Sequence, residues 1–173
     1  MTFERTHDAA LIRAIVTHPR LWPHVGDDFT PCADAWRPEF APYLLYLLCK
    51  DAHEPLRGGR DEAALLSEPK TPEDVLGLWL FVIRGACWET HACMLPGVWG
   101  AQATRCAREM FAWLWRSTPC RRLIASIPAY NRPALAFAAR IGMTRFAVNE
   151  RSYLRDGVLY DQILFGLSRP EPN

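Results

Sequence analysis

Residues 87–115, "CWETHACMLPGVWGAQATRCAREMFAWLW", constrain the fold more than any other stretch of the chain. Residues 87–95 read as an extended strand, and residues 101–115 carry apolar side chains at helical spacing. A short loop of small residues joins the two. The apolar helix face comprises Ala103, Ala107, Met110, Phe111, Leu114 and Trp115. A helix patterned in this way packs its apolar face on a sheet, so this stretch predicts a strand, a tight loop and a covering helix.

The flanking segments predict a mixed sheet with helices on it. A first helix is expected to begin near Asp8 as N-cap, and Pro119 is expected to end the helix after residue 101. A third helix is expected in residues 131–143, with Pro133 near its start and Gly142 at its C-cap. Strands are expected in residues 2–6, 43–50, 75–84, 87–95, 121–127, 145–154 and 158–167. Residues 43–50 are short enough to fit a helix as well, and residues 51–74 read as a loop with a short helix at residues 61–66.

Length and charge narrow the class of protein. A chain of 173 residues fits one domain, expected over residues 1–173. The formal net charge of +1 argues against a nucleic-acid binder that works through bulk electrostatics. No run of residues has the length and apolarity of a signal peptide or a membrane span, so we expect a cytoplasmic protein that binds no membrane.

The cysteines are widely spaced and form no C-x-x-C pair. This pattern predicts reduced thiols, with neither a disulfide framework nor a zinc site. The six are Cys32, Cys49, Cys87, Cys93, Cys106 and Cys120. We therefore expect no metal.

The loop "GVWGAQAT" precedes a helix N-terminus, where unpaired backbone N–H groups attract phosphate. Gly97, Gly100, Ala101 and Ala103 would let a pyrophosphate approach the main chain, and Thr104 adds a hydroxyl. The alternative is a plain strand-to-helix connection whose small residues serve packing.

The order of elements resembles the GNAT superfamily of N-acetyltransferases over residues 75–168. The segment 87–115 looks like its central strand, pyrophosphate loop and helix. "IPAYNRPALAFAARIGM" looks like its later N-x-x-[AS]…G-[FM] segment, and the closing Asp-Gly turn matches its C-terminal hairpin. The wording "ETHACMLPGVWG" is also similar to members carried by phages and prophages.

The resemblance implies a fold and a cofactor site. The fold is a twisted, mostly antiparallel sheet, of mixed α/β class, in which a parallel strand pair splays apart to admit acetyl-CoA as co-substrate. Residues 75–168 would form the cofactor-binding core, and residues 1–74 a variable part with acceptor-side helices and an inserted loop. The implied cofactor contacts are Met94, Leu95, Trp99, Gly100, Ala101, Gln102, Ala103, Thr104, Asn131 and Arg140.

Two positions depart from the family pattern. The loop usually reads [QR]-x-x-G-x-[GA], but only its central glycine, Gly100, is kept here, with Gly97 and Gln102 at the outer positions. The tyrosine that often protonates the leaving thiolate is replaced by Ala138. Tyr130, Ser126 and Tyr153 are the substitutes that lie near it in sequence.

The candidate catalytic residues lie on the strand before the loop. Its period of two places Glu89, His91 and Cys93 on one face. A carboxylate and an imidazole suit the removal of a proton from an amine, and we assign Glu89 and His91 this role. Alternatively, Glu89 is solvated and His91 is structural. A Cys93–His91 nucleophile is disfavoured, because direct transfer needs no covalent step.

These features predict transfer of an acetyl group from acetyl-CoA to a primary amine on a small molecule or protein. The rival hypothesis is a non-catalytic GNAT-like accessory or assembly protein; a binding module of unrelated fold is a third. Asp27 and Asp28 either attract a cationic amine or form a solvated acidic turn. A homodimer is left open.

Overall fold

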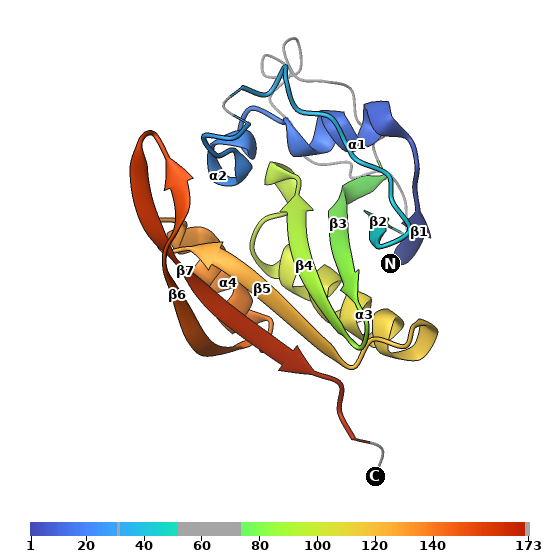
Figure 1. Cartoon of the computed structure of the whole chain (residues 1–173). Coiled ribbons are helices and arrows are strands. Elements are labelled where there is room, and N and C mark those ends of the chain that lie inside the picture. The colour runs from blue at the N-terminus through green and yellow to red at the C-terminus, as the bar shows by residue number, and fades with distance from the viewer. Residues whose placement is uncertain (31, 52–73, 172–173) are drawn as a thin grey trace.

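The computed structural model describes residues 1–30, 32–51 and 74–171, which form one mixed sheet with helices on both of its sides (Figure 1). The strands are β1 Thr2–Arg5, β2 Leu44–Lys50, β3 Val75–Arg84, β4 Cys87–Met94, β5 Arg122–Pro128, β6 Thr144–Arg155 and β7 Val158–Ser168. The helices are α1 Ala9–Val16, α2 Trp22–Val25, α3 Ala101–Ser117 and α4 Arg132–Arg140, with a short 3₁₀ helix, η2, at Pro96–Val98.

The seven strands run in the order β1-β2-β3-β4-β5-β7-β6. Among the strands that the structure describes, only β4 and β5 are parallel, and α3 makes the crossover between them. The other neighbouring pairs in this sheet are antiparallel. The predicted mixed sheet with one parallel pair is therefore confirmed.

Local sequence signals set the helix ends. Asp8 caps α1, because its Oδ1 accepts the N–H groups of Ala10 and Leu11 at 3.0 Å. Asn131 caps α4 through the N–H of Ala134. Gly142 has a φ of 92° just after α4, as the predicted C-terminal glycine requires.

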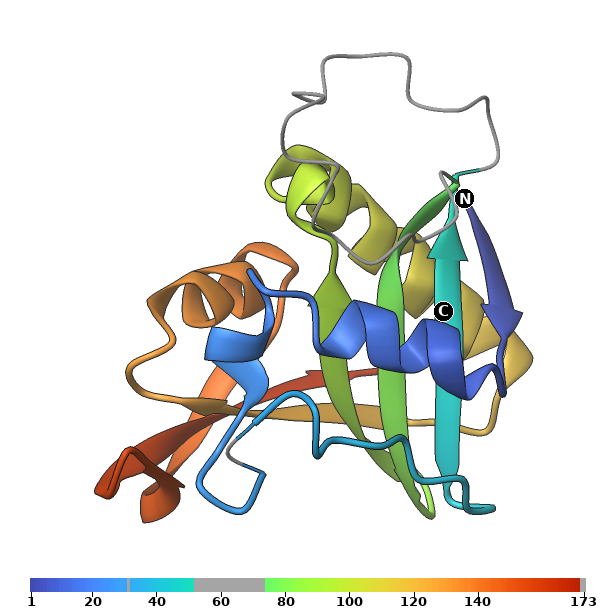
Figure 2. The same cartoon turned by 90° about the horizontal axis from the view of Figure 1, so that it is seen from above.

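The helices cover the sheet on opposite sides (Figure 2). α3 packs on the side that carries Trp79, whose ring makes an edge contact with Phe111 of α3. α1 contacts β3 on the other side, where Ile12 and Ile15 are fully buried. α4 lies on the α3 side and contacts β5 and β6.

Two features differ from the sequence-based expectations, and one expectation concerns residues that the structure does not describe. Residues 22–25 form α2, a helix that was not among those expected, and Pro23 fits in its first turn. The structure pairs Cys49 of β2 with Cys106 of α3 as a disulfide, so the prediction of six free thiols is wrong for these two. The spacing rule missed this pair because the sheet and α3 bring together cysteines that are 57 residues apart. The predicted helix at residues 61–66 lies outside the described residues.

Within the described ranges, no helix is long and apolar enough to cross a membrane.

Candidate functional site

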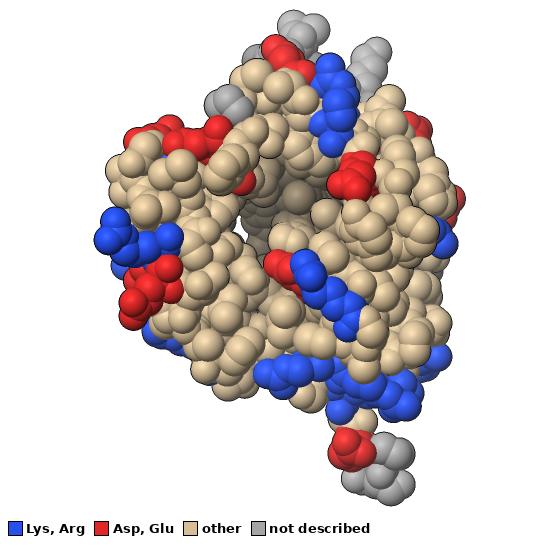
Figure 3. Space-filling view, viewed as in Figure 1, with Lys and Arg blue, Asp and Glu red and all other residues tan. Residues whose placement is uncertain are grey.

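The parallel strands β4 and β5 separate part of the way along their length. They are in register for three residue pairs, from Cys87 and Arg122 to Glu89 and Ile124. Beyond this point β4 continues to Met94 and β5 to Pro128 without pairing to each other. The strands therefore diverge, and a deep hollow opens on the face seen in Figure 3.

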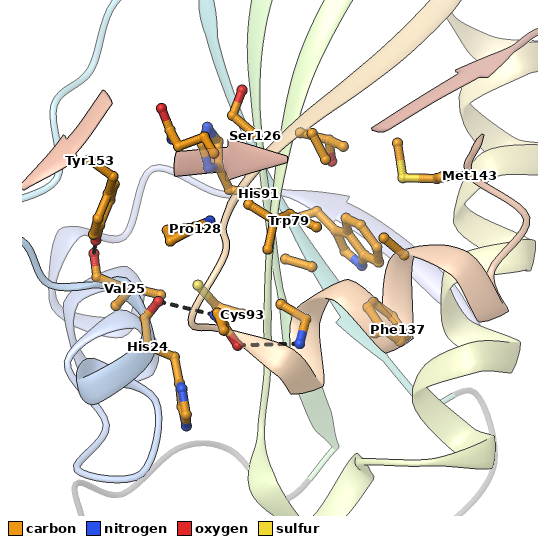
Figure 4. A pocket seen from close by; sticks show the side chains of 18 of the residues that line it. His24, Val25, Trp79, His91, Cys93, Ser126, Pro128, Phe137, Met143 and Tyr153 are labelled. Carbon is orange, nitrogen blue, oxygen red and sulfur yellow. Dashed lines mark hydrogen bonds between the residues drawn. The ribbon is translucent and has the colours of Figure 1, made fainter. Parts of the chain in front are cut away.

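The first cavity lies in this opening and has a volume of about 340 Å³. Successive strand residues point to opposite sides, so Thr90 and His91 both line it but from different sides of the sheet. Figure 4 shows His91 and Ser126 on one side, and Trp79, Phe137 and Met143 toward the other. The opening thus connects the two faces of the sheet.

The second cavity, of about 420 Å³, runs from the first toward the N-terminus of α3. Both cavities share the wall formed by Ala92, Cys93, Asn131, Ala134 and Phe137. The second brings together six of the predicted cofactor contacts: Met94, Trp99, Gly100, Ala103, Asn131 and Arg140.

The other four predicted contacts lie beside the cavities without lining them. Leu95 is a core residue that is 7% exposed. The Thr104 hydroxyl donates to the Gly100 carbonyl at 2.9 Å, so its proton is held within the helix. Ala101 and Gln102 lie in the first turn of α3.

The start of α3 has the backbone expected of an anion site. Gly100 has a φ of 94°, a conformation that side chains disfavour, and a Cβ there would meet open space. Thr104 donates its N–H to the Gly100 carbonyl in the first intrahelical bond, so the N–H groups of Ala101, Gln102 and Ala103 precede that ladder.

Trp99 shields this helix start. Its Nε1 donates to the Met94 carbonyl at 2.8 Å, and the Arg20 guanidinium lies 5.1 Å from the centre of its ring. Arg20 does not line the second cavity itself, but it contacts Trp99, which does. No sequence pattern pointed to Arg20, because only the folded chain brings residues 17–21 to this loop.

Glu89 and His91 lie together on β4, as predicted. His91 Nε2 is 3.6 Å from Glu89 Oε1. The side chain of His91 is 45% exposed and lines the first cavity, where other residues crowd around it. Burial lowers the pKa of His91, and the Glu89 carboxylate raises it in part. A neutral imidazole can accept a proton.

The buried environment of Cys93 disfavours a nucleophilic role for its thiol. Burial raises the pKa of its thiol to about 12, so the thiolate is scarce at neutral pH.

Of the three neighbours suggested as proton donors, Ser126 and Tyr153 line the first cavity, whereas Tyr130 lines neither. Tyr153 donates its hydroxyl to the Gly26 carbonyl at 2.9 Å, and burial raises its pKa. Tyr130 accepts a hydrogen bond from Arg155 at 3.1 Å. Of these three candidates, Ser126 is thus the one that both lines the cavity and appears beside His91 in Figure 4.

The segment that includes α2 closes the cavities on the α1 side. Asn131 both caps α4 and donates its Nδ2 to the His24 carbonyl at 3.4 Å. Asp28 accepts the N–H groups of Asp156 and Gly157, at 2.7 and 2.8 Å, and so binds the β6–β7 turn. Asp28 is therefore a structural residue, whereas Asp27 lines the first cavity.

Sequence patterns also did not identify two polar groups of the site. Trp79 and Thr90 appeared to be ordinary sheet residues, yet both line the first cavity. Trp79 Nε1 and Thr90 Oγ1 are buried and have no hydrogen-bond partner among the described residues.

Comparison with solved structures identifies the fold. A mutant form of spermidine N-acetyltransferase SpeG from Vibrio cholerae is similar over 97% of this chain and 95% of its own, with a TM-score of 0.67 and 10% identity. The microcin C7 self-immunity acetyltransferase MccE, solved with acetyl-CoA and AMP, is similar over 73% of this chain, with a TM-score of 0.50 and 17% identity. A GNAT-family acetyltransferase from Bacillus anthracis is similar over 56% of this chain, with a TM-score of 0.50 and 16% identity.

The match spans 60% of the length of each of the last two proteins. No protein-family model and no curated protein sequence matches the chain. The structural likeness, together with the splayed parallel pair, shows that the chain has the fold of the GNAT-family acetyltransferases.

Proposed function

We propose that this protein is an N-acetyltransferase that moves an acetyl group from acetyl-CoA to a primary amine. The observation that carries the proposal is the opening between β4 and β5, with His91 on one side and a cavity leading to the N-terminus of α3 on the other. The solved complex of MccE with acetyl-CoA supports the choice of donor. Such an enzyme would work in the cytoplasm, where acetyl-CoA is made.

The residues present fit an acyl-CoA. The edge of β4 beyond Glu89 has no strand partner on the β5 side, so it can pair with the amide groups of a pantetheine arm. The second cavity, lined by Ala92 and Cys93 at one end and by Gly100 at the other, would lead that arm to the start of α3. There, the N–H groups before Thr104 and the guanidinium groups of Arg20 and Arg140 would hold phosphates.

His91 would serve as the base. The amine nitrogen attacks the thioester carbonyl carbon, and His91 Nε2 takes the proton that the nitrogen loses. The carbon–sulfur bond then breaks, and the sulfur accepts one proton, which His91 can return directly or through Ser126. For a neutral amine, the proton that leaves the nitrogen thus ends on the thiol. An amine that enters as an ammonium ion first releases one further proton to solvent, and direct transfer of this kind needs no metal ion.

The acceptor would enter on the α1 side of the sheet. The carboxylates of Glu89 and Asp27 lie on that side and favour a cationic amine. SpeG is a spermidine N-acetyltransferase, so polyamines belong in the first set of acceptors to be tested.

Free-thiol release from acetyl-CoA in the presence of a panel of primary amines, spermidine included, tests the proposal. We expect turnover with at least one amine and a loss of about 10²–10⁴-fold in His91→Ala. His7→Ala is the matched control, because His7 is exposed and lines neither cavity. Equal turnover in the two variants would refute the role of His91.

The rival function is a non-catalytic protein that keeps the fold. Ala138 favours it, since this buried residue of α4 brings no hydroxyl to the cavity wall. Acetyl-CoA binding without turnover on any amine would support the rival.

A further inference from the structure

The first cavity continues past the point where a thioester would meet His91. On the α4 side of the sheet, its wall is apolar and contains two small residues, Ala125 and Ala138. Met143 and Phe137 complete this wall (Figure 4). We call this part of the cavity the inner chamber.

The inner chamber holds two polar groups that lack partners. Trp79 is 1% exposed and Thr90 is 6% exposed, yet Trp79 Nε1 and Thr90 Oγ1 bond to no described residue. Buried donors are nearly always paired in folded proteins, so two unpaired donors on one cavity wall indicate a missing acceptor. Register places them close together, because Trp79 pairs with Ala92 and Thr90 lies two residues before Ala92 on the same face.

The chemistry of the wall restricts the acceptor. An indole N–H can only donate, and a threonine hydroxyl can donate as well. None of the described residues that line the first cavity is a lysine or an arginine, so a carboxylate there would lack a permanently charged cationic partner. The wall therefore suits a neutral oxygen, such as a hydroxyl or a ketone, on an otherwise apolar group.

Position indicates which part of a ligand reaches the inner chamber. An acyl-CoA lying along the second cavity would place its thioester at Ala92 and Cys93, which line both cavities. The carbons beyond the thioester would then extend toward Thr90 and Trp79. An acetyl group ends after one such carbon, and it carries no oxygen beyond the thioester.

We propose that the inner chamber is an acyl-specificity pocket, in which Thr90 and Trp79 bind a neutral oxygen on a short acyl chain, as in a 3-hydroxyacyl or 3-oxoacyl group. This inference rests on the proposed function and narrows its donor: the enzyme accepts acetyl-CoA but prefers a longer, oxygenated acyl group. Thr90 and Trp79 act on specificity and take no part in proton transfer.

Calorimetric titration of the purified protein with four ligands tests this, and it needs no knowledge of the acceptor. The ligands are acetyl-CoA, butyryl-CoA, 3-hydroxybutyryl-CoA and malonyl-CoA. We expect 3-hydroxybutyryl-CoA to bind about tenfold more tightly than butyryl-CoA, because the site's donors stay unpaired with the latter. Malonyl-CoA, which brings a carboxylate, should bind most weakly.

Two variants assign the preference to the named groups. Thr90→Val and Trp79→Phe keep much of the side-chain shape and remove one donor each, so each should reduce the tenfold preference. Thr118→Val is the control, because the Thr118 hydroxyl bonds to Leu114 at the far end of α3. Thermal unfolding of each variant, with acetyl-CoA affinity as a second check, shows that the binding site is folded.

The outcomes separate the two proposals. If acetyl-CoA binds at least as tightly as 3-hydroxybutyryl-CoA, or if Thr90→Val and Trp79→Phe both keep the preference, the specificity pocket is refuted while the proposed function stands. If none of the four ligands binds, the proposed function itself fails.

Discussion

His91 Nε2 lies 3.6 Å from Oε1 of Glu89, two residues back on the same face of β4. Burial lowers the pKa of His91, and the Glu89 carboxylate offsets part of that shift. Burial and Glu89 together therefore set the pH above which the His91 imidazole is neutral and can accept a proton.

The pH dependence of turnover follows from this pair. His91 must be neutral to accept a proton, so kcat/KM should rise with pH through a pKa below the ordinary histidine value and then level off. Glu89→Gln removes the contribution that raises the pKa, so the rising limb should move to lower pH with the same amine acceptor. A limb that moves to higher pH would contradict the assignment.

Gly77 sets how closely β3 approaches β4 at the site. A Cβ on Gly77 would lie 2.7 Å from the Cys93 carbonyl oxygen and 2.8 Å from Met94 Cα, both backbone atoms. We expect Gly77→Ala to cost about 1–3 kcal/mol of unfolding free energy and to weaken acyl-CoA binding, because it displaces the cavity wall. Gly97→Ala, with nothing within 4 Å of its Cβ, should cost far less. Equal urea midpoints for the two variants would count against this account.

The two roles of Asn131 can be separated. Serine is as good an N-cap as asparagine, but its shorter side chain lacks the Nδ2 amide group that donates to the His24 carbonyl. Asn131→Ser should therefore leave thermal stability nearly unchanged and weaken acetyl-CoA binding, whereas Asn131→Ala should also lose about 1 kcal/mol of stability. If Asn131→Ser binds acetyl-CoA as tightly as wild type does, Asn131 serves as a helix cap and takes no part in cofactor binding.

Asp28 joins the segment that includes α2 to the β6–β7 turn. Asp28→Ala removes two charge-assisted hydrogen bonds and should cost about 2 kcal/mol, measured by urea unfolding. Asp28→Asn keeps one acceptor oxygen and should fall between wild type and alanine. If both variants match wild type, the turn does not depend on Asp28.

Sequence patterns were sufficient for most of the fold. The strands, the caps Asp8 and Asn131, and the helix after Gly100 are local features with strong periodic or capping signals. Strand order and the Cys49–Cys106 pair were not accessible, because each depends on contacts between distant segments.

The candidate site was predictable only in part. Glu89 and His91 follow from strand alternation, and the loop at Gly100 from its small residues. Arg20, Trp79 and Thr90 carry no such pattern. The relevance of Arg20 comes from its contact with the ring of Trp99, which is distant in sequence. That of Trp79 and Thr90 comes from unpaired polar groups that only the folded cavity reveals.

The central claim is that an acyl-CoA occupies the opening between β4 and β5. Its most direct test is calorimetric titration of acetyl-CoA into wild type, Ala134→Leu and Ala139→Leu. Ala134 lines both cavities, whereas Ala139 is an exposed residue of the same helix that lines neither. We predict that Ala134→Leu weakens binding at least about tenfold, equivalent to about 1.4 kcal/mol, while Ala139→Leu matches wild type. Equal affinity in all three proteins, or no binding to wild type, would contradict the account.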